Sequence, residues 1–256
     1  MSEKTSADAN LLRTQLRLGE MLVDYGQQRD AKRFVRAMRR FFRGTTLNKK
    51  SVLDIGGGIG ACSFFAATLG ATDVLCFEPH ADGSEGIPPE GFDAIRRKMG
   101  LTQVKLIEAE FSPRHLEREF DIVVLHNVVN HLNEAACESL HRSEAAESAY
   151  RRIFKELAAV MSASGKIILS DCARHNLWGD LRIRNPITPT IEWKKHQQPR
   201  RWADLLTSSG LTVDEIDWTF PARLGDSWRP LLGNRVAAYL TNSHFRLTAS
   251  RSQTLR

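Results

Sequence analysis

Between residues 51 and 171, short apolar runs alternate with stretches whose apolar positions recur at helical spacing. The runs predict five strands, at residues 51–55, 73–77, 104–107, 121–125 and 166–171. Between them, helices are expected at residues 61–69 and 145–161. Strands that are apolar throughout and separated by helices indicate a parallel sheet covered on both faces. Right-handed crossovers place the carboxyl ends of such strands along one edge, where ligands bind.

The N-terminal segment follows a helical pattern throughout. Two helices are predicted, at residues 10–25 and 30–42, with Asp30 as the N-cap of the second and Gly44 as its stop. We therefore expect a helical cap over residues 1–50, ahead of a main domain over residues 51–256.

The pattern changes again after the fifth strand. Residues 173–200 show no clear period and are rich in Arg, Trp, Pro and His, which predicts an inserted lid or substrate-binding segment. A helix at residues 201–208 and two last strands, at residues 211–219 and 235–241, then complete a sheet of seven strands.

Composition and charge are those of an ordinary globular protein. Of the 256 residues, 42% are hydrophobic and 26% are charged, and the net charge of +6 is only mildly basic. The apolar runs are far shorter than the ~20 residues that span a bilayer, and the polar N-terminus predicts no signal peptide, so no membrane insertion is expected. Four widely spaced cysteines without a C-x-x-C pair indicate reduced thiols in a cytoplasmic protein.

The first predicted strand runs into a glycine-rich loop, VLDIGGGIG, at residues 52–60. Gly56, Gly58 and Gly60 allow a tight turn and a close approach of the backbone to a ligand, at the start of a helix whose N–H groups suit an anion. The same loop also fits the dinucleotide fingerprint, so an NAD-dependent oxidoreductase is an alternative. Asp54 separates the two cofactors, because an acid is unfavourable beside a pyrophosphate but favourable beside the ammonium and sulfonium of S-adenosylmethionine.

The order D-x-G-x-G-x-G at residues 54–60 resembles the first motif of the class I S-adenosylmethionine-dependent methyltransferases. The segment FDIVVLHNVVNHL, residues 120–132, is similar to the strand-four motif of that family. The resemblance covers residues 51–171. It implies a Rossmann-like, mostly parallel seven-stranded α/β sheet with helices on both faces, S-adenosylmethionine as the cofactor, and methyltransferase activity.

The resemblance also suggests which residues hold the cofactor. Glu78 ends the second strand, where an acid can accept both ribose hydroxyls. Pro79 and His80 would lie against the adenine, and Glu110, with Glu108 as its rival, would accept from the adenine amine. The full expected set is Asp54, Gly56, Gly57, Gly58, Gly60, Glu78, Pro79, Glu110, Phe111, His126 and Asn127.

Methyl transfer depends on alignment of the acceptor with the methyl carbon, and an oxygen acceptor also needs a base. The catalytic candidates at the expected strand ends are His126, Asp171 and His175. Glu192, Trp193 and His196, in IEWKKHQQPRRW, would line the acceptor site, although the tryptophans of this segment could instead anchor it to the core. No acidic set of the catechol-methyltransferase kind stands out, so we expect a metal-independent enzyme.

These observations favour O-methylation of a small molecule, a metabolite or a sugar. The alternative is an RNA or protein methyltransferase that docks through the basic residues of 32–43, so nucleic acid is a possible but not a favoured partner. The strand-four end reads HNVV and not NPPY, which argues against DNA adenine methylation. A non-enzymatic partner or sensor is a third class, against which the intact Asp54, glycines and Glu78 argue.

Overall fold

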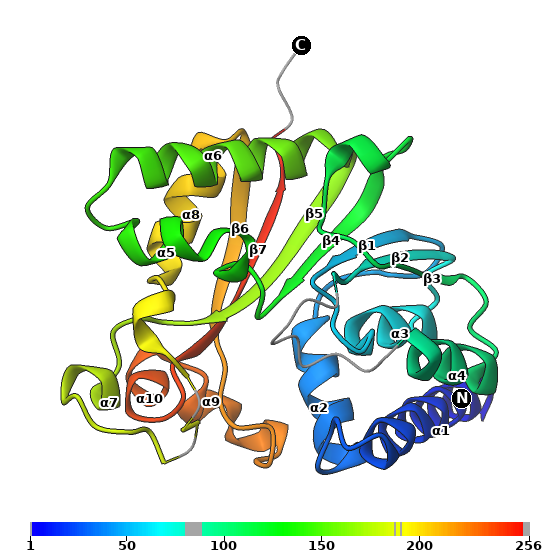
Figure 1. The fold of residues 1–256 in the computed structure, drawn as a ribbon. Helices are drawn as coiled ribbons and strands as arrows, with labels where there is room; N and C mark the ends of the chain where they lie inside the picture. Colours follow the sequence, from blue (N-terminus) through cyan, green and yellow to red (C-terminus); the bar gives the residue numbers. More distant parts are fainter. Residues whose placement is uncertain (1, 80–88, 187, 190, 253–256) are drawn as a thin grey trace. The chain divides into compact units, whose positions relative to one another are not determined.

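In the computed structural model the chain forms two compact units (Figure 1). The structure describes residues 2–79, 89–186, 188–189 and 191–252. The first unit comprises Met1–Ser112 and Phe120–Val124, and the second comprises Pro113–Glu119 and Leu125–Arg256. The chain passes between them within strand β4 (Phe120–His126).

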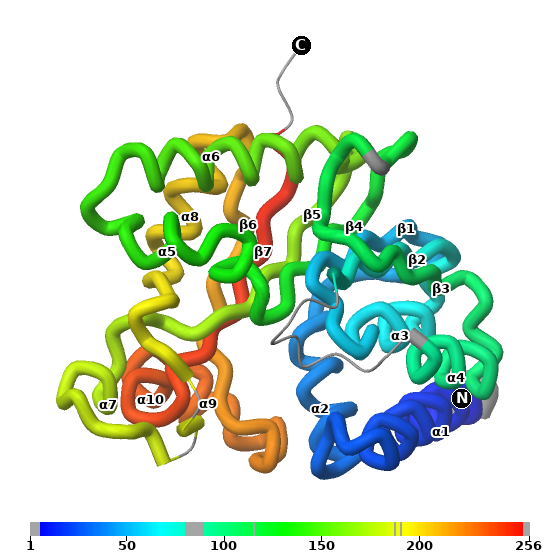
Figure 2. The backbone as a smooth tube through the Cα atoms, viewed as in Figure 1, coloured from blue at the N-terminus to red at the C-terminus, as the bar shows by residue number. Residues whose placement is uncertain are grey.

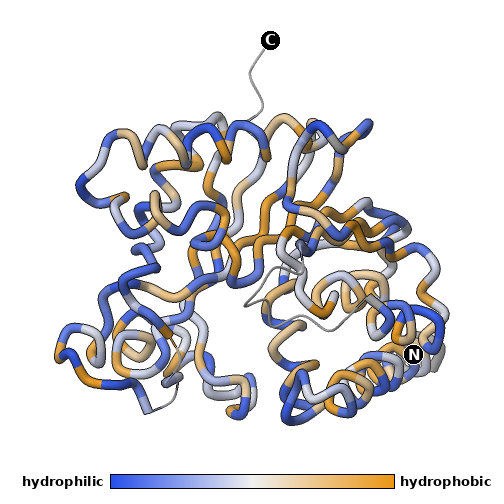
Figure 3. Tube along the Cα trace, viewed as in Figure 1, coloured by the Kyte–Doolittle hydropathy of each residue, from blue (hydrophilic) through white to orange (hydrophobic). Residues whose placement is uncertain are grey.

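Seven strands form one sheet in the order β3-β2-β1-β4-β5-β7-β6. Strands β1, β2, β3 and β4 pair in parallel, while β7 is antiparallel to both of its neighbours. The predicted α/β sheet is confirmed, and in Figure 3 the parallel strands β1, β2 and β4 are mostly coloured as hydrophobic, as expected for a covered sheet.

The first unit joins the N-terminal helices to the first half of the sheet. Its elements are α1 (Ser2–Asp24), α2 (Ala31–Phe41), β1 (Ser51–Ile55), α3 (Ala61–Thr68), β2 (Asp73–Phe77), α4 (Pro89–Met99) and β3 (Val104–Ile107). The N-terminal helices belong to the same compact unit as β1–β3, and the division into a helical cap over residues 1–50 and a main domain over residues 51–256 stays a prediction.

Helix α2 illustrates why this sequence folds as it does. Asp30 is its N-cap, as predicted, and its carboxylate accepts a hydrogen bond of 2.5 Å from the backbone of Arg33. Phe34, Val35, Met38 and Phe41 recur at helical spacing and are buried. The ring of Phe34 meets that of Phe65, on α3, edge to face at 5.8 Å.

The parallel register aligns the strand ends of this unit. Ile55 pairs with Phe77, and Phe77 pairs with Ile107. The residues that follow β1, β2 and β3 therefore come to one edge of the sheet, as the sequence predicts for the glycine loop and Glu78.

The second unit contains the rest of the sheet and short helices around it. Its elements are η1 (Pro113–His115), η2 (His131–Asn133), α5 (Glu134–Ser139), α6 (Glu144–Ala159), β5 (Met161–Cys172), α7 (Leu177–Asp180), η3 (Trp193–Lys195), α8 (Pro199–Ser208), β6 (Leu211–Trp218), η4 (Asp226–Trp228), α9 (Arg229–Leu232), α10 (Arg235–Leu240) and β7 (His244–Arg251). Its core includes Trp202 between Tyr150 and Phe154 of α6, at ring distances of 5.0 and 6.1 Å. Figure 2 shows the irregular path of the described residues between β5 and α8.

Two predicted elements were wrong. Residues 235–241, expected as a strand, form helix α10, because the side chain of Asn234 caps Ala237 and starts a helical turn. The last strand is β7, further along the chain. Strand β5 also begins earlier than expected, at Met161, so the predicted SASG turn lies inside the strand.

All four cysteines are free and buried. Among the described residues, no helix combines the length and the hydropathy required to cross a membrane.

Candidate active site

The glycine loop lies at the end of β1 in the first unit, as predicted. Gly56, Gly58 and Gly60 all have positive φ, between 55° and 76°, a conformation that side chains rarely adopt. Gly57 needs to be glycine for a different reason. A Cβ there would lie 2.4 Å from Cys76 Sγ and 2.9 Å from Asp54 Oδ2.

Asp54 lies under this loop and is 1% exposed. The hydroxyl of Ser63 donates to its Oδ2 at 2.7 Å, while Oδ1 is buried without a hydrogen-bond partner in the structure. Burial raises the pKa of Asp54 from 3.8 to about 6, against the opposing hydrogen bond from Ser63. A buried carboxylate oxygen without a partner favours a cationic or hydrogen-bonding ligand.

Glu78 follows β2 and is also buried. Its Oε2 accepts a hydrogen bond of 2.7 Å from the backbone N–H of Gly58. The acid at the end of the second strand therefore bonds directly to the glycine loop. Glu78 is 20 residues from Gly58 in the sequence, and the sequence alone did not predict this hydrogen bond.

The other predicted cofactor residues of this unit lie at the ends of β2 and β3. Pro79 and Glu110 are exposed, as is the rival Glu108. The Phe111 ring packs edge to face on Phe77, with centroids 5.7 Å apart. His80 lies outside the described residues.

These groups suit the predicted cofactor. An added Cβ at Gly58 would point into open space, so the loop presents bare backbone there. Together with the unpartnered oxygen of Asp54, this backbone would receive the amino-acid part of S-adenosylmethionine. Glu78 has the chemistry to accept from its ribose hydroxyls.

The second unit contains a buried acid–histidine pair. Asp171, near the end of β5, is 1% exposed and accepts a 2.7 Å hydrogen bond from Nδ1 of His196. Its other oxygen accepts from Nε1 of Trp202, on α8, at 3.3 Å. The sequence named Asp171 and His196 as separate candidates, and the structure brings them together. The sequence left Trp202 either on the wall of the acceptor site or as an anchor to the core.

A second pair lies beside the first. The thiol of Cys172 is 3.2 Å from Nε2 of His244, whose Nδ1 donates to the carbonyl of Asn242 at 2.9 Å. Burial lowers the pKa of His244 and raises that of Cys172 well above its usual range, so the thiol donates to a neutral imidazole. Neither residue was predicted as part of a site, and His244 was missed because the last strand was expected elsewhere.

Ligand atoms of Asp171, Cys172 and His196 lie within 4.8 Å of one another, a grouping that could hold a metal ion. In the metal-free protein, burial raises the pKa of Cys172 and keeps its thiol protonated. Asp171 and His196 satisfy each other's hydrogen-bonding groups directly.

His126 ends β4 and Asn127 follows it, both in the second unit. Burial, and to a lesser degree His244, lowers the pKa of His126 to about 4, so its imidazole is neutral at physiological pH. Asn127 has a φ of 56°, and its N–H donates to Ser170 O at 2.9 Å. This bond fixes the turn that leaves the strand.

The remaining predicted residues are more exposed. The side chain of His175 is 68% exposed and pairs with Asp180 at 3.2 Å. Glu192 is exposed and pairs with Lys195. Trp193 is half-buried, with its ring 6.4 Å from that of His196.

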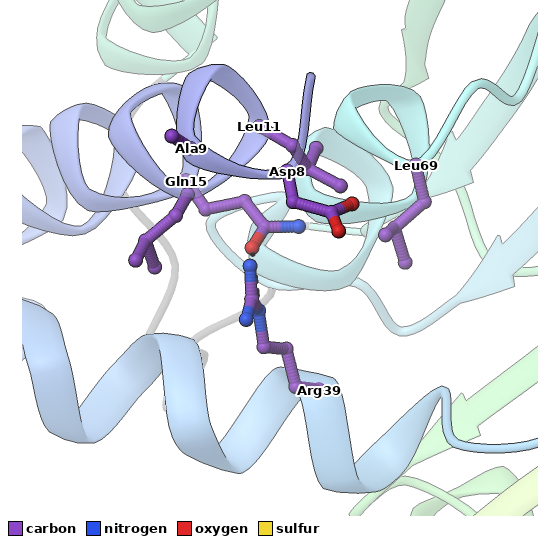
Figure 4. Close-up of a pocket in the computed structure, with 7 residues that line it drawn as sticks. Asp8, Ala9, Leu11, Gln15, Arg39 and Leu69 are labelled. Carbon is purple, nitrogen blue, oxygen red and sulfur yellow. Dashed lines mark hydrogen bonds between the residues drawn. The ribbon is translucent and has the colours of Figure 1, made fainter. Parts of the chain in front are cut away.

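A hollow of about 520 Å³ lies in the first unit, and none of the residues that line it belongs to the glycine loop (Figure 4). There the Arg39 guanidinium donates to Oε1 of the buried Gln15 at 2.8 Å. Its lining residues are Asp8, Ala9, Leu11, Leu12, Gln15, Arg39 and Leu69. Arg39 is one of the basic residues of α2, so part of the predicted docking surface is engaged within the protein.

Comparison with known proteins gives a consistent family and fold. Residues 26–216 match the model of a family described as "Methyltransferase domain". The comparison with curated proteins found no match.

Three solved structures illustrate the fold. A putative S-adenosylmethionine dependent methyltransferase from Listeria monocytogenes is 14% identical, with a TM-score of 0.55 over 85% of this chain and 96% of that one. Magnesium protoporphyrin IX methyltransferase from Synechocystis PCC 6803, with bound SAH, is 16% identical, with a TM-score of 0.53 over 98% and 95%. The mitomycin 7-O-methyltransferase MmcR is 12% identical, with a TM-score of 0.54 over 86% of this chain. The chain spans about half the length of MmcR and of the pyocyanin biosynthetic protein PhzM, 54% in each case.

Proposed function

The chain belongs to the methyltransferase-domain family and uses S-adenosylmethionine, and we propose that it methylates a hydroxyl oxygen of a small molecule, such as a metabolite or a sugar. The observation that carries this proposal is the buried Asp171–His196 hydrogen bond of 2.7 Å. An acid–imidazole pair of this kind suits removal of a proton from a hydroxyl group.

The first unit is assigned to the cofactor. When bound, S-adenosylmethionine supplies a methyl group on an activated sulfonium. The bare backbone at Gly58 and the unpartnered oxygen of Asp54 would hold its amino-acid part, and Glu78 its ribose. Pro79, Glu110, Phe111 and Asn127 remain proposed neighbours of the cofactor.

The second unit is assigned to the acceptor. Because Nδ1 of His196 donates to Asp171, the lone pair of the imidazole is on Nε2, where it can accept a proton from a hydroxyl. The proton passes to Nε2 as the oxygen gains the methyl group, and the carboxylate of Asp171 stabilises the resulting imidazolium. Trp202 fixes Asp171 through its indole N–H and is a positioning residue.

His196, which the sequence predicted would line the acceptor site, is therefore proposed as the general base. The same assignment also ranks the other histidines. His175 is largely exposed and pairs with Asp180 at the surface, so it suits a surface role better than proton removal from a bound acceptor. His126 is neutral and partly buried, and could accept a hydrogen bond from the acceptor or cofactor.

A small molecule fits the acceptor role for two reasons. Mitomycin 7-O-methyltransferase has the same fold, and its name describes transfer to an oxygen of a small molecule. The Asp171–His196 pair is buried, and Trp193 and Glu192 lie close to His196 in the sequence. A buried pair suits a compact acceptor better than a large polymer.

The test uses the full chain, S-adenosylmethionine and a panel of phenols, catechols and sugars. Formation of S-adenosylhomocysteine is measured with each compound, and cofactor binding is measured by calorimetry. His196→Ala should lower kcat by about 100-fold or more with the best acceptor, the range for loss of a general base. The cofactor Kd should change by less than about twofold, because His196 is not assigned to that site.

His175→Ala is the matched control, since it removes an exposed histidine that also pairs with an acid. It should retain nearly full activity. Equal activity of the His196 and His175 variants would refute the role of the pair. Turnover of amine or thiol acceptors alone would refute the oxygen assignment but leave the methyltransferase itself intact.

A further inference from the structure

Exposed large hydrophobic side chains concentrate on one part of the second unit. Seven such side chains occur in the described residues, and six of them lie in residues 177–186 and 223–240. They are between 48% and 69% exposed: Leu181, Ile183, Trp228, Leu231, Val236 and Leu240. The seventh, Leu12, is on α1 of the first unit and is 39% exposed. We call residues 177–186 and 223–240 the arginine–apolar surface.

Hydrogen bonds hold the two segments of this surface together. The indole N–H of Trp178, in α7, donates to the carbonyls of Leu240 and Thr241 at the end of α10. The hydroxyl of Tyr239 donates to Asp180 at 3.2 Å, and α10 also packs on α9. The surface is therefore an ordered part of the unit.

The pattern on α10 is the reverse of that in a core helix. Val236 and Leu240, four residues apart and on one helical face, are exposed, while the small Ala238 is buried. A cluster of exposed large apolar side chains is unusual on a protein that does not bind something there.

The charges around these side chains are mostly positive. Five arginines and only two aspartates occur in the surface, which gives a formal charge of +3: the arginines are Arg182, Arg184, Arg223, Arg229 and Arg235, and the acids are Asp180 and Asp226. Asp180 is already engaged by His175 and Tyr239, and Arg229 by Asp217. Arginines alternate with apolar residues in the run Leu181-Arg182-Ile183-Arg184.

We propose that the arginine–apolar surface docks the protein on an anionic phospholipid surface. Apolar side chains and Trp228 would enter the boundary between headgroups and acyl chains, while the arginines would reach the phosphates above it. The docking is peripheral and involves no membrane-spanning segment. It is independent of the proposed acceptor.

A second copy of the chain fits the same surface less well. A symmetric dimer would place identical patches against each other and bring the arginines of both copies together. Anionic lipid supplies the opposite charge, and it needs no complementary shape.

The test is co-sedimentation of the full chain with vesicles. Vesicles of phosphatidylcholine with 30% phosphatidylglycerol, roughly the anionic content that gives a strong surface potential, are compared with pure phosphatidylcholine. Binding to the anionic vesicles alone, which weakens as salt rises, is the expected result. Arg182→Gln with Arg235→Gln should weaken it by about fivefold for each arginine.

Leu231→Ser with Val236→Ser should weaken binding by about tenfold through lost apolar insertion. Leu12→Ser is the matched control and should bind like the unaltered protein. Both pairs of changes are on exposed side chains, and circular dichroism confirms that the variants fold. Absence of vesicle binding, or equal binding to neutral vesicles, would overturn the proposal. So would a concentration-dependent dimer in sedimentation that the Leu231→Ser and Val236→Ser changes abolish.

Discussion

At the scale of single residues, Asp54 shows how burial sets up a charge for a ligand. The loop above it excludes water, which raises its pKa to about 6 and leaves one oxygen without a partner. A raised carboxyl pKa costs stability: the folded protein binds more protons than the unfolded chain between pH 3.8 and about 6, so stability falls as pH rises through that window. A cationic ligand would recover this cost.

The affinity for S-adenosylmethionine should therefore increase as pH rises through about 6. Below that pH, Asp54 is largely protonated and cannot pair with the ammonium or sulfonium, and affinity should change by at most about tenfold per pH unit. Calorimetry between pH 5 and 7 measures the change. Asp54→Asn should weaken binding and flatten this pH dependence, and an unchanged pH profile in that variant would assign the titration to another group.

Gly57 gives a second prediction at this scale, because its neighbours are known. Gly57→Ala should destabilise the protein by about 1–3 kcal/mol and weaken cofactor binding, since the new methyl group would overlap Cys76 Sγ. Adding Cys76→Gly removes that sulfur and should restore part of the lost affinity, with Asp54 Oδ2 as the remaining close neighbour. Thermal melts and calorimetry on both variants distinguish this outcome from a general loss of folding, in which the second change would only add damage.

At the scale of elements, prediction succeeded where a local pattern and its cap agreed. Strands β2 and β3 have the predicted bounds, and α2 begins at its predicted N-cap. Residues 235–240 failed because their short apolar run suits a strand or a helix equally, and the cap by Asn234 decides between them. Because the last strand was expected at residues 235–241, the sequence did not predict β7, and His244 at its start was not recognised.

The cap of α2 can be tested directly. Asp30→Ala should cost about 1 kcal/mol, the usual value for an N-cap, because the backbone of Arg33 loses its acceptor. Asp30→Ser keeps a capping oxygen and should cost clearly less. Chemical unfolding measures both. Equal losses would mean that the helix is held by its buried face and not by its cap.

At the scale of the whole molecule, the proposed cofactor residues were easier to predict from the sequence than the acid–histidine pair of the second unit. The glycine loop, Asp54 and Glu78 lie within a short stretch of chain and carry a recognisable order. His196 and Trp202 follow Asp171 by 25 and 31 residues, across an irregular segment. Only tertiary folding brings them within hydrogen-bond distance, so the sequence could name two of them but not the pair.

Cofactor binding should stabilise the folded protein as a whole. At a concentration 100 times its Kd, S-adenosylmethionine should add about 2.7 kcal/mol to the free energy of unfolding. The Tm of the unaltered protein should rise accordingly in a thermal melt. Asp54→Asn at the same concentration should show a smaller rise, whereas the exposed control Leu12→Ser should match the unaltered protein.

The four buried cysteines give the molecule an internal reporter of its own motions. Cys62 and Cys76 lie in the first unit, and Cys137 and Cys172 in the second. Burial raises the pKa of all four thiols, so an alkylating reagent reacts with each only when its surroundings open. The order in which they are labelled, read by mass spectrometry without introducing any probe, would show which unit opens first and whether the cofactor closes one unit or both.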